Sequence, residues 1–341
     1  MAQIYSTLMT IISFVVIFGV IVFVHELGHF MFAKWHNIRV EEFAMGMGKR
    51  LLSFQKGETT YALNLFPIGG YVRMEGEDQS SNDPRAFSNA KPFVQFQVLI
   101  AGAAMNFILG WLALTVLFFN QGIPVNVVGS TIPDFPAAKA GLLKGDVLEE
   151  INGAKTKDWN SVTTAIKSST DSVDIKILRK HEPMVIKMKI AVDPASNKKV
   201  IGIMPAYEKH IGGAAVYATK QFGEISTAIL DFFKQIPQKG VDGNDVAGPL
   251  GMAKIVGEAA EAGINPLLGL TALFSINLGI FNLLPFPALD GGRLIFVIIE
   301  LITGKRPSKE KEGFVHGIGM MILLALMVLV LFNDFNRILF K

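Results

Sequence analysis

The chain has 341 residues, of which 50% are hydrophobic and 18% are charged, and its formal net charge is +3. Soluble domains usually carry about 25% charged residues, so the composition indicates an integral membrane protein with a polar part attached. So small a net charge, without a basic stripe, gives no reason to expect a nucleic-acid partner, and the absence of cysteine excludes disulfides and thiolate metal ligands.

Four apolar segments are long enough to cross about 30 Å of hydrocarbon at roughly 1.5 Å per residue. They are residues 5–33, 95–119, 267–286 and 314–332. The N-terminus lacks the basic region and the cleavage site of a signal peptide, so we expect the first segment to remain as a span. The predicted fold class is therefore a membrane α-helical protein with about four transmembrane helices.

Lysine and arginine are concentrated between residues 34 and 91 and in the loop after the third span, between residues 293 and 311. Short loops rich in these residues lie in the cytoplasm. We therefore expect residues 37–92 and the loop after the third span to be cytoplasmic. Both termini and residues 124–264 should then lie outside.

The first span contains the sequence HELGH. His25 and His29 are four residues apart, so on a helix they project from one face and can bind one metal ion. Glu26 lies on the neighbouring face, where it can reach a water molecule on that metal. This H-E-x-x-H arrangement is typical of zinc hydrolases. The alternative is a chance match, but an acidic side chain inside a span costs about 2.5–3.5 kcal/mol, which favours a function.

Two segments beyond the first span have distinct patterns. "YALNLFPIGGYVRME" alternates apolar and polar residues and is interrupted by Pro67 and by Gly69-Gly70, which predicts short strands joined by a turn. "AGAAMNFILG" in the second span places small residues before Asn106, as in closely packed helices. The Asn106 amide could bond another helix or donate to a developing oxyanion.

Residues 124–192 carry the signals of a compact domain with strands, Gly-Asp and Asn-Gly turns, an amphipathic helix and a hairpin. Residues 193–266 are predicted to be an amphipathic helical linker beside the membrane, or alternatively a linker with one buried face. The predicted domains are thus 1–123 with the first two spans, 124–192, 193–266, and 267–341 with the last two spans.

The third span supplies a candidate for the third metal ligand, which two histidines require if one position is left for water. Pro285 and Pro287 break this helix, and Asp290 follows them. A broken helix at membrane depth must face protein or a watery cavity, so we expect Asp290 to project towards His25 and His29. Alternatively, Asp290 caps a following helix. The other histidines are expected to be solvated or interfacial, namely His36, His181, His210 and His316.

Two further amides, Asn277 and Asn282, lie in the third span. Amides within a span often make interhelical hydrogen bonds, worth about 0.6–2 kcal/mol. The functional alternative is that these amides pair with the backbone of an unwound substrate.

With HELGH in the first span and "NLLPFPALDGG" in the third, the sequence resembles the site-2 protease family of intramembrane zinc metalloproteases, and in particular its RseP-like bacterial subgroup. "FPIGGYV" resembles that family's membrane-associated β-loop. "AGAAMNFILG" resembles its Gly-x-x-x-Asn motif, although Ala103 stands where proline is more usual. "PAAKAGLLKGDVLEEING" resembles a PDZ domain inserted between spans two and three.

The resemblance implies a Zn2+ ion bound by His25, His29 and Asp290, with Glu26 as the general base. It implies substrate contacts for Asn277 and Asn282. The remaining substrate-binding candidates are Asn106, Gly69, Gly70 and Tyr71.

The resemblance also implies a multi-pass protein of the bacterial cytoplasmic membrane with a cytoplasmic β-loop and an extracytoplasmic PDZ domain. Its expected substrates are single-span membrane proteins, for example anti-sigma factors or signal-peptide remnants. The best-studied Gram-negative members have two PDZ domains, whereas this chain has room for one, which favours a Gram-positive type. The sequence predicts no oligomeric state.

The main alternative is a zinc-binding membrane scaffold or transporter whose PDZ-like domain recruits partners. Such a protein would need the metal ligands but not Glu26. A third hypothesis keeps the protease and makes the PDZ domain only a size filter in a signal cascade.

Overall fold

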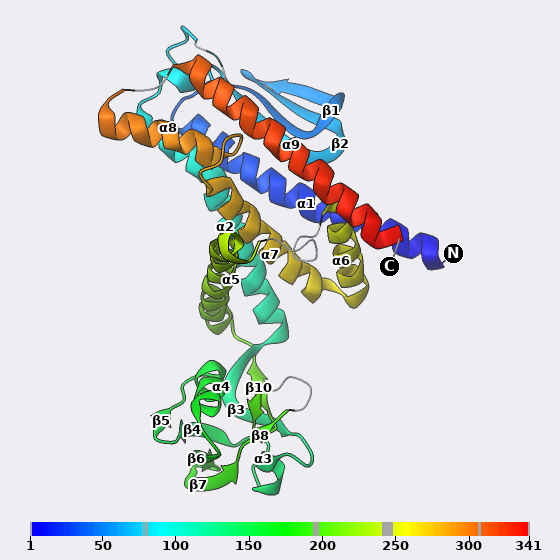
Figure 1. Ribbon diagram of the computed structural model, residues 1–341, viewed down its shortest axis with the longest axis vertical. Coiled ribbons are helices and arrows are strands. Elements are labelled where there is room, and N and C mark those ends of the chain that lie inside the picture. Colours follow the sequence, from blue (N-terminus) through cyan, green and yellow to red (C-terminus); the bar gives the residue numbers. More distant parts are fainter. Residues whose placement is uncertain are drawn as a thin grey trace. The chain divides into compact units, whose positions relative to one another are not determined.

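The computed structural model describes residues 2–77, 79, 81–193, 198–240, 248–305 and 308–339 (Figure 1). The other residues, which fall within the predicted domains, lie outside the described part of the chain. The chain divides into two compact units. Unit 1 comprises Met1–Leu117 and Ala218–Lys341, and unit 2 comprises Phe118–Tyr217.

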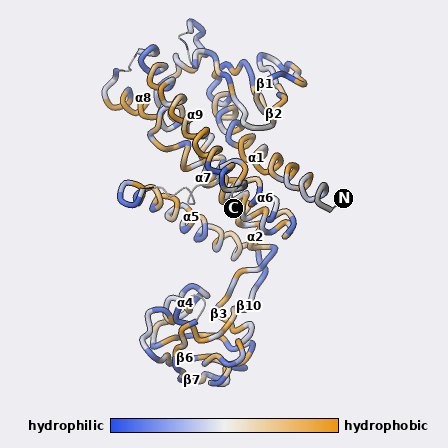
Figure 2. Tube along the Cα trace, turned by 45° about the vertical axis from the view of Figure 1, so that its right-hand side comes forward, coloured by the Kyte–Doolittle hydropathy of each residue, from blue (hydrophilic) through white to orange (hydrophobic). Residues whose placement is uncertain are grey.

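Four helices of the described residues are long and apolar enough to cross a membrane, which agrees with the predicted number of candidate spans. Hydrophobic residues run along most of their length (Figure 2). A helix satisfies its own backbone hydrogen bonds, as a segment in lipid must. The four are α1 (Ala2–Trp35), α2 (Pro92–Gln121), α7 (Ile264–Leu283) and α9 (Lys309–Leu339).

The third of these helices ends at Leu283, three residues before the predicted end at residue 286. Pro285 and Pro287 cannot donate a backbone hydrogen bond, so the chain leaves the helix before them. A loop over residues 284–289 leads into α8 (Asp290–Thr303). The connection between the third and fourth spans, treated above as a loop, thus contains the helix that was named as an alternative after Asp290. α8 is amphipathic, with Leu294 and Val297 buried.

The segment after α1 forms two long antiparallel strands, β1 (Val40–Lys56) and β2 (Thr59–Met74). Residues 42–45 of β1 have partners both at residues 60–63 and at residues 70–73 of β2. β2 bends at Gly69, whose φ is +86°, a conformation open to glycine. The end of β2 therefore forms one edge of this sheet.

One hydrophobic core joins the sheet to the helices of unit 1. It contains side chains from α1, both strands, the short helix Phe87–Asn89, α2 and α8. Because these elements share one core, they hold the ends of α1 and α8 at fixed positions. Its buried residues are Ala33, Ile38, Val40, Phe43, Val72, Met74, Phe87, Val98, Leu99, Leu294 and Val297.

The predicted linker contains two helices, α5 (Ile211–Lys239), most of which belongs to unit 1, and α6 (Pro249–Ala262), which lies wholly in unit 1. α6 packs closely on α1, since a Cβ added at Gly257 would lie 2.4 Å from Thr10 Oγ1. The Asp334 carboxylate of α9 accepts the backbone N–H groups of Gly248, Leu250 and Gly251 at 3.0–3.1 Å. The start of α6 is thereby capped by another helix.

Unit 2 is a sheet with strand order β10-β3-β4-β6-β7, in which β5 also pairs with β4. Its apolar core includes Val128, Leu148, Val162 and Ile175. The unit extends beyond the predicted range 124–192 because β10 pairs with β3. Its strands are β3 (Ile123–Thr131), β4 (Val147–Ile151), β5 (Ala154–Lys155), β6 (Ser172–Arg179), β7 (Glu182–Lys189), β8 (Ala191–Val192), β9 (Lys199–Val200) and β10 (Ile203–Glu208), and its short helices are α3 (Pro136–Lys139) and α4 (Trp159–Ser168).

Candidate metal centre

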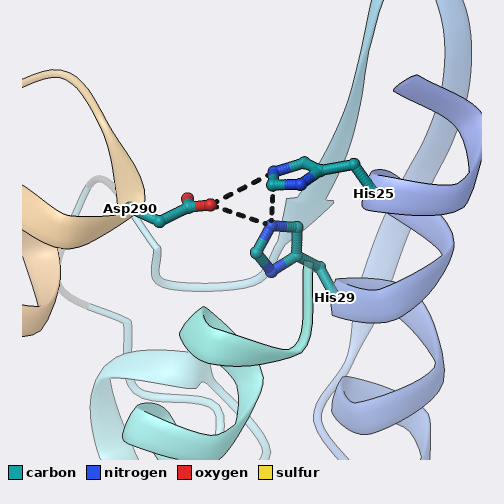
Figure 3. Close-up of side chains that lie close together, drawn as sticks. All are labelled: His25, His29 and Asp290. Carbon is teal, nitrogen blue, oxygen red and sulfur yellow. Dashed lines mark hydrogen bonds and ion pairs between the residues drawn. The ribbon is translucent and has the colours of Figure 1, made fainter. Parts of the chain in front are cut away.

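Three side chains converge between α1 and the start of α8 (Figure 3). Asp290 Oδ2 lies 3.1 Å from His25 Nε2 and 3.3 Å from His29 Nε2, and the two nitrogens are 3.2 Å apart. Each histidine is only 7% exposed. The predicted grouping of His25, His29 and Asp290 therefore exists as a cluster of potential metal ligands.

The spacing of these three atoms fits one zinc ion. Zinc ligands of this kind lie at about 2.0–2.1 Å in a tetrahedron, whose corners are then about 3.3–3.4 Å apart. The observed separations of 3.1–3.3 Å are close to that value. Three corners are filled by protein atoms, so the fourth would be open to water, as in catalytic rather than structural zinc sites.

Neighbouring groups orient both histidines so that Nε2 faces the cluster. His29 Nδ1–H donates to the Val98 carbonyl at 2.8 Å. The Asn106 side-chain amide lies 3.2 Å from His25 Nδ1. The amide atom at this distance is Nδ2, and the buried Oδ1 has no hydrogen-bond partner among the described residues. Turning the amide by 180° would let Oδ1 accept a hydrogen bond from Nδ1–H, which leaves the Nε2 lone pair for a metal.

Asn106 is thus placed behind a histidine and has no exposed surface. This position differs from the expected contact with substrate or with an oxyanion. Glycines on both helices let α1 and α2 approach each other closely at the cluster. A Cβ added at Gly102 would lie 2.3 Å from His29 Nε2, and one added at Gly28 would lie 2.4 Å from the Ala101 carbonyl oxygen.

Asp290 is the first residue of α8 but does not cap it. The cap position is Leu289, and no side chain makes a capping hydrogen bond there. The Asp290 carboxylate instead points towards the two histidines (Figure 3). The alternative in which Asp290 serves as a helix cap is therefore wrong.

Glu26 is half-buried and stands outside the ligand cluster. The backbone of β2 runs beside it, since a Cβ added at Gly70 would lie 3.1 Å from Glu26 Cγ. Gly70 pairs with Met45, and Tyr71 pairs with Ala44. The edge of the sheet that contains Gly69, Gly70 and Tyr71 therefore borders the carboxylate.

The two asparagines of α7 differ in position. The Asn282 amide nitrogen lies 3.4 Å from His25 Nε2, so this side chain reaches the cluster. Asn277 is half-buried five residues earlier, and within the described residues no hydrogen bond joins it to the three clustered side chains. The structure brings Asn282 to the centre but not Asn277.

An ion pair that was not predicted from the sequence lies near the start of α8. Arg293, one turn after Asp290 on α8, pairs with Glu77 at the end of the β1–β2 sheet. Glu77 also accepts the backbone N–H of Met74 at 3.2 Å. The pair links the end of the sheet to the helix that carries Asp290. The available signal was an arginine three residues after Asp290, at the start of an apolar run.

Two buried histidines on a helix of membrane length, a carboxylate at zinc spacing at the start of α8 and a separate glutamate beside them are the groups that a zinc hydrolase within a membrane requires. The chain belongs to peptidase family M50, whose family model matches residues 13–326. It is thus a metalloprotease of the site-2 protease type.

Relatives match over nearly the whole chain. A Clostridium acetobutylicum protein named as a zinc metalloprotease is 35% identical over 95% of this chain and 96% of its own length. A Fusobacterium nucleatum zinc metalloprotease is 35% identical over 96% of this chain and 98% of its own length. The Bacillus subtilis regulator of sigma-W protease RasP is 31% identical over 96% of this chain and 99% of its own length.

Solved structures match part of the chain. The PDZ domain of an SdrC-like protein from Listeria innocua is 30% identical, with a TM-score of 0.22. The match covers 26% of this chain and 99% of that domain.

Proposed function

We propose that this protein hydrolyses peptide bonds within or near the transmembrane segment of membrane proteins, with His25, His29 and Asp290 as zinc ligands and Glu26 as the general base. The observation that carries the proposal is the meeting of three ligand atoms at zinc spacing, two of them on a helix long enough to cross a membrane and the third at the start of α8, which follows another such helix. A soluble substrate would not require this chemistry to lie inside apolar helices.

Each residue has a distinct part in the reaction. Zinc bound at this site would lower the pKa of a water molecule to about 7 and polarise the carbonyl of the bond to be cut. Glu26 removes a proton from the water and passes it to the leaving amine. Asn106 and the Val98 carbonyl keep the two histidines oriented.

The substrate must be extended when it is cut, because the peptide bonds of a helix are shielded by their own hydrogen bonds. The edge formed by Gly70–Met74 lies next to Glu26 and can hold an extended peptide by strand pairing. Gly70 has no side chain to fill the space beside Glu26. The amide of Asn282, which reaches the same centre, is available to bond the substrate backbone.

Unit 2 contains a groove that suits a peptide. A cavity of about 330 Å³ lies between α4 and residues 198–204, with Trp159, Ile166 and Ile203 among its apolar walls and Lys167 and Lys199 also lining it. An apolar groove with adjacent cations fits a peptide whose end is apolar and carries a carboxylate. We assign this PDZ-like unit the selection of substrates.

The name of the Bacillus subtilis relative, a regulator of sigma-W protease, supports a role in regulated intramembrane proteolysis with single-span membrane proteins such as anti-sigma factors as substrates. Remnants of signal peptides are the other class of short membrane segment that would fit. Either class of substrate fits a protein of the bacterial cytoplasmic membrane, which is the location we propose.

The function can be tested with the full chain reconstituted in liposomes. It is expected to cleave a single-span membrane protein, to lose that activity to a zinc chelator and to regain it when zinc is added back. A soluble unfolded protein of matched length serves as the control. Cleavage of the soluble protein but not of the membrane protein would contradict the proposal.

The proposed orientation places residues 37–92 in the cytoplasm and unit 2 outside, from the distribution of lysine and arginine. The chain has no cysteine, so single cysteines can be labelled without background. Two exposed positions suit this test, Asn82 and Asn160. In intact cells, a membrane-impermeant thiol reagent should label Asn160→Cys and should reach Asn82→Cys only after the membrane is opened, and the reverse pattern would refute the orientation.

A further inference from the structure

The loop before Asp290, residues 284–289, has few backbone hydrogen bonds of its own. Pro285 and Pro287 have no N–H to donate. The loop's own hydrogen bonds include Phe286 N–H to the Leu284 carbonyl at 2.7 Å and Leu289 N–H to the Phe286 carbonyl at 3.2 Å. The position of Asp290 must therefore depend on contacts with other elements.

Ala288, two residues before Asp290, has a φ of +77°. Residues other than glycine rarely adopt this left-handed region, and such a conformation persists only where the surroundings hold it. Loss of a single contact that holds Ala288 can therefore let its φ return to a negative value and move the backbone that leads into Asp290.

That contact comes from α9. The Ala288 N–H donates to His316 Nδ1 at 2.9 Å. The His316 ring also lies near Phe296 of α8, with 5.9 Å between the ring centroids. The imidazole is thus packed on α8 while it bonds the loop before α8.

A second feature of α9 receives the same loop. Gly319 lies three residues after His316, which places both on one face of the helix. A Cβ added at Gly319 would lie 2.4 Å from the Pro287 carbonyl oxygen and 2.5 Å from Pro287 Cβ. α9 therefore contacts residues 287–288 in two ways. His316 Nδ1 accepts a hydrogen bond, and Gly319 leaves space for Pro287.

We propose that His316 is a positioning residue of the metal centre. It holds the backbone at Ala288 so that the Asp290 carboxylate stays within reach of His25 and His29. This inference rests on the proposed zinc site and adds to it a residue from the fourth span, which contacts Ala288 and Phe296. His316 was expected to be solvated or interfacial. That expectation is corrected here, because His316 is half-buried and accepts a hydrogen bond from Ala288.

The test compares metal retention in full-length variants purified in detergent. The rate at which a chelator removes zinc and the visible absorption spectrum of the cobalt-substituted protein both report the ligand geometry. His316→Ala is expected to release zinc at least about tenfold faster and to alter the cobalt spectrum, since loss of partners that orient ligands costs about 10–100-fold in metal affinity. Met320→Ala, an exposed position on α9, is the control and should match the wild type.

Rescue distinguishes positioning from general destabilisation. In His316→Asn the amide oxygen can take the place of Nδ1 as acceptor, whereas the longer side chain of His316→Gln displaces it. His316→Asn should therefore retain zinc within about threefold of the wild type, and His316→Gln should resemble the alanine variant.

Two outcomes would overturn the inference. One is a wild-type zinc release rate and cobalt spectrum in His316→Ala. The other is equal release rates in His316→Asn and His316→Gln, which decides the matter even if His316→Ala does not fold. Failure of the wild-type protein to bind zinc at all would instead overturn the proposed function, so the two failures can be told apart.

Discussion

Glu26→Gln is expected to insert into the membrane normally, to keep its zinc, and to lose at least about a hundredfold in turnover, the lower end of the range for loss of a general base. Glutamine has the size of glutamate and forms hydrogen bonds, but it cannot accept a proton from water at neutral pH. Glu26 stands beside the ligand cluster and outside it, so its replacement should spare the metal. Turnover of a single-span substrate in liposomes, measured together with zinc content, checks both parts.

Glu258→Gln provides a matched control, because this residue is an exposed glutamate on α6. It should cleave at the wild-type rate. Glu26→Gln should still bind substrate and retain it in pull-down experiments, since only proton transfer is lost. If Glu26→Gln cleaved nearly as fast as the wild type, zinc would have a structural role and Glu26 would not be the base.

Asp290→Ala is expected to lower bound zinc to well below one ion per chain, as His25→Ala should. Two histidines alone leave half of a tetrahedral site without protein ligands. The measurement is the zinc content of the purified variants by elemental analysis. Asp231→Ala, which removes an exposed carboxylate of α5, is the control and should keep a full complement of zinc. Stoichiometric zinc in Asp290→Ala would eliminate Asp290 as a ligand.

The part of the site that depends on local geometry could be predicted from the sequence. The spacing of His25 and His29 fixes their shared helix face, whatever surrounds it. Pro285 and Pro287 mark the helix break before Asp290, because proline ends a helix through its own covalent structure. The four spans follow from segment length and apolar composition in the same way.

The contacts between distant segments could not be predicted. The bond from Ala288 to His316 and the ion pair of Glu77 with Arg293 each join segments far apart in the chain. Asn106 was expected to face substrate, but its direction depends on how α1 and α2 cross at Gly28 and Gly102. Helix crossing and side-chain direction arise from tertiary packing, which local spacing does not specify.

The two strands after α1 illustrate the same limit. The alternation in "YALNLFPIGGYVRME" predicted short strands joined by a turn, whereas this segment forms one strand, β2, and its partner β1 was not predicted. The pairing of residues 42–45 with two separate parts of β2 was not predicted, because register depends on how the bent strands meet. This pairing makes Gly70–Met74 an edge beside Glu26.

The most direct test of the central claim is the position and chemistry of the cut. A single-span substrate would be cleaved by the reconstituted wild-type protein in water enriched in oxygen-18, and the products would be identified by intact mass. The expected result is a cut inside or at the border of the apolar segment, with one oxygen-18 atom in the new carboxyl terminus and no cut with Glu26→Gln. A cut confined to a soluble domain of the substrate, or the same products from Glu26→Gln, would contradict intramembrane hydrolysis by this site.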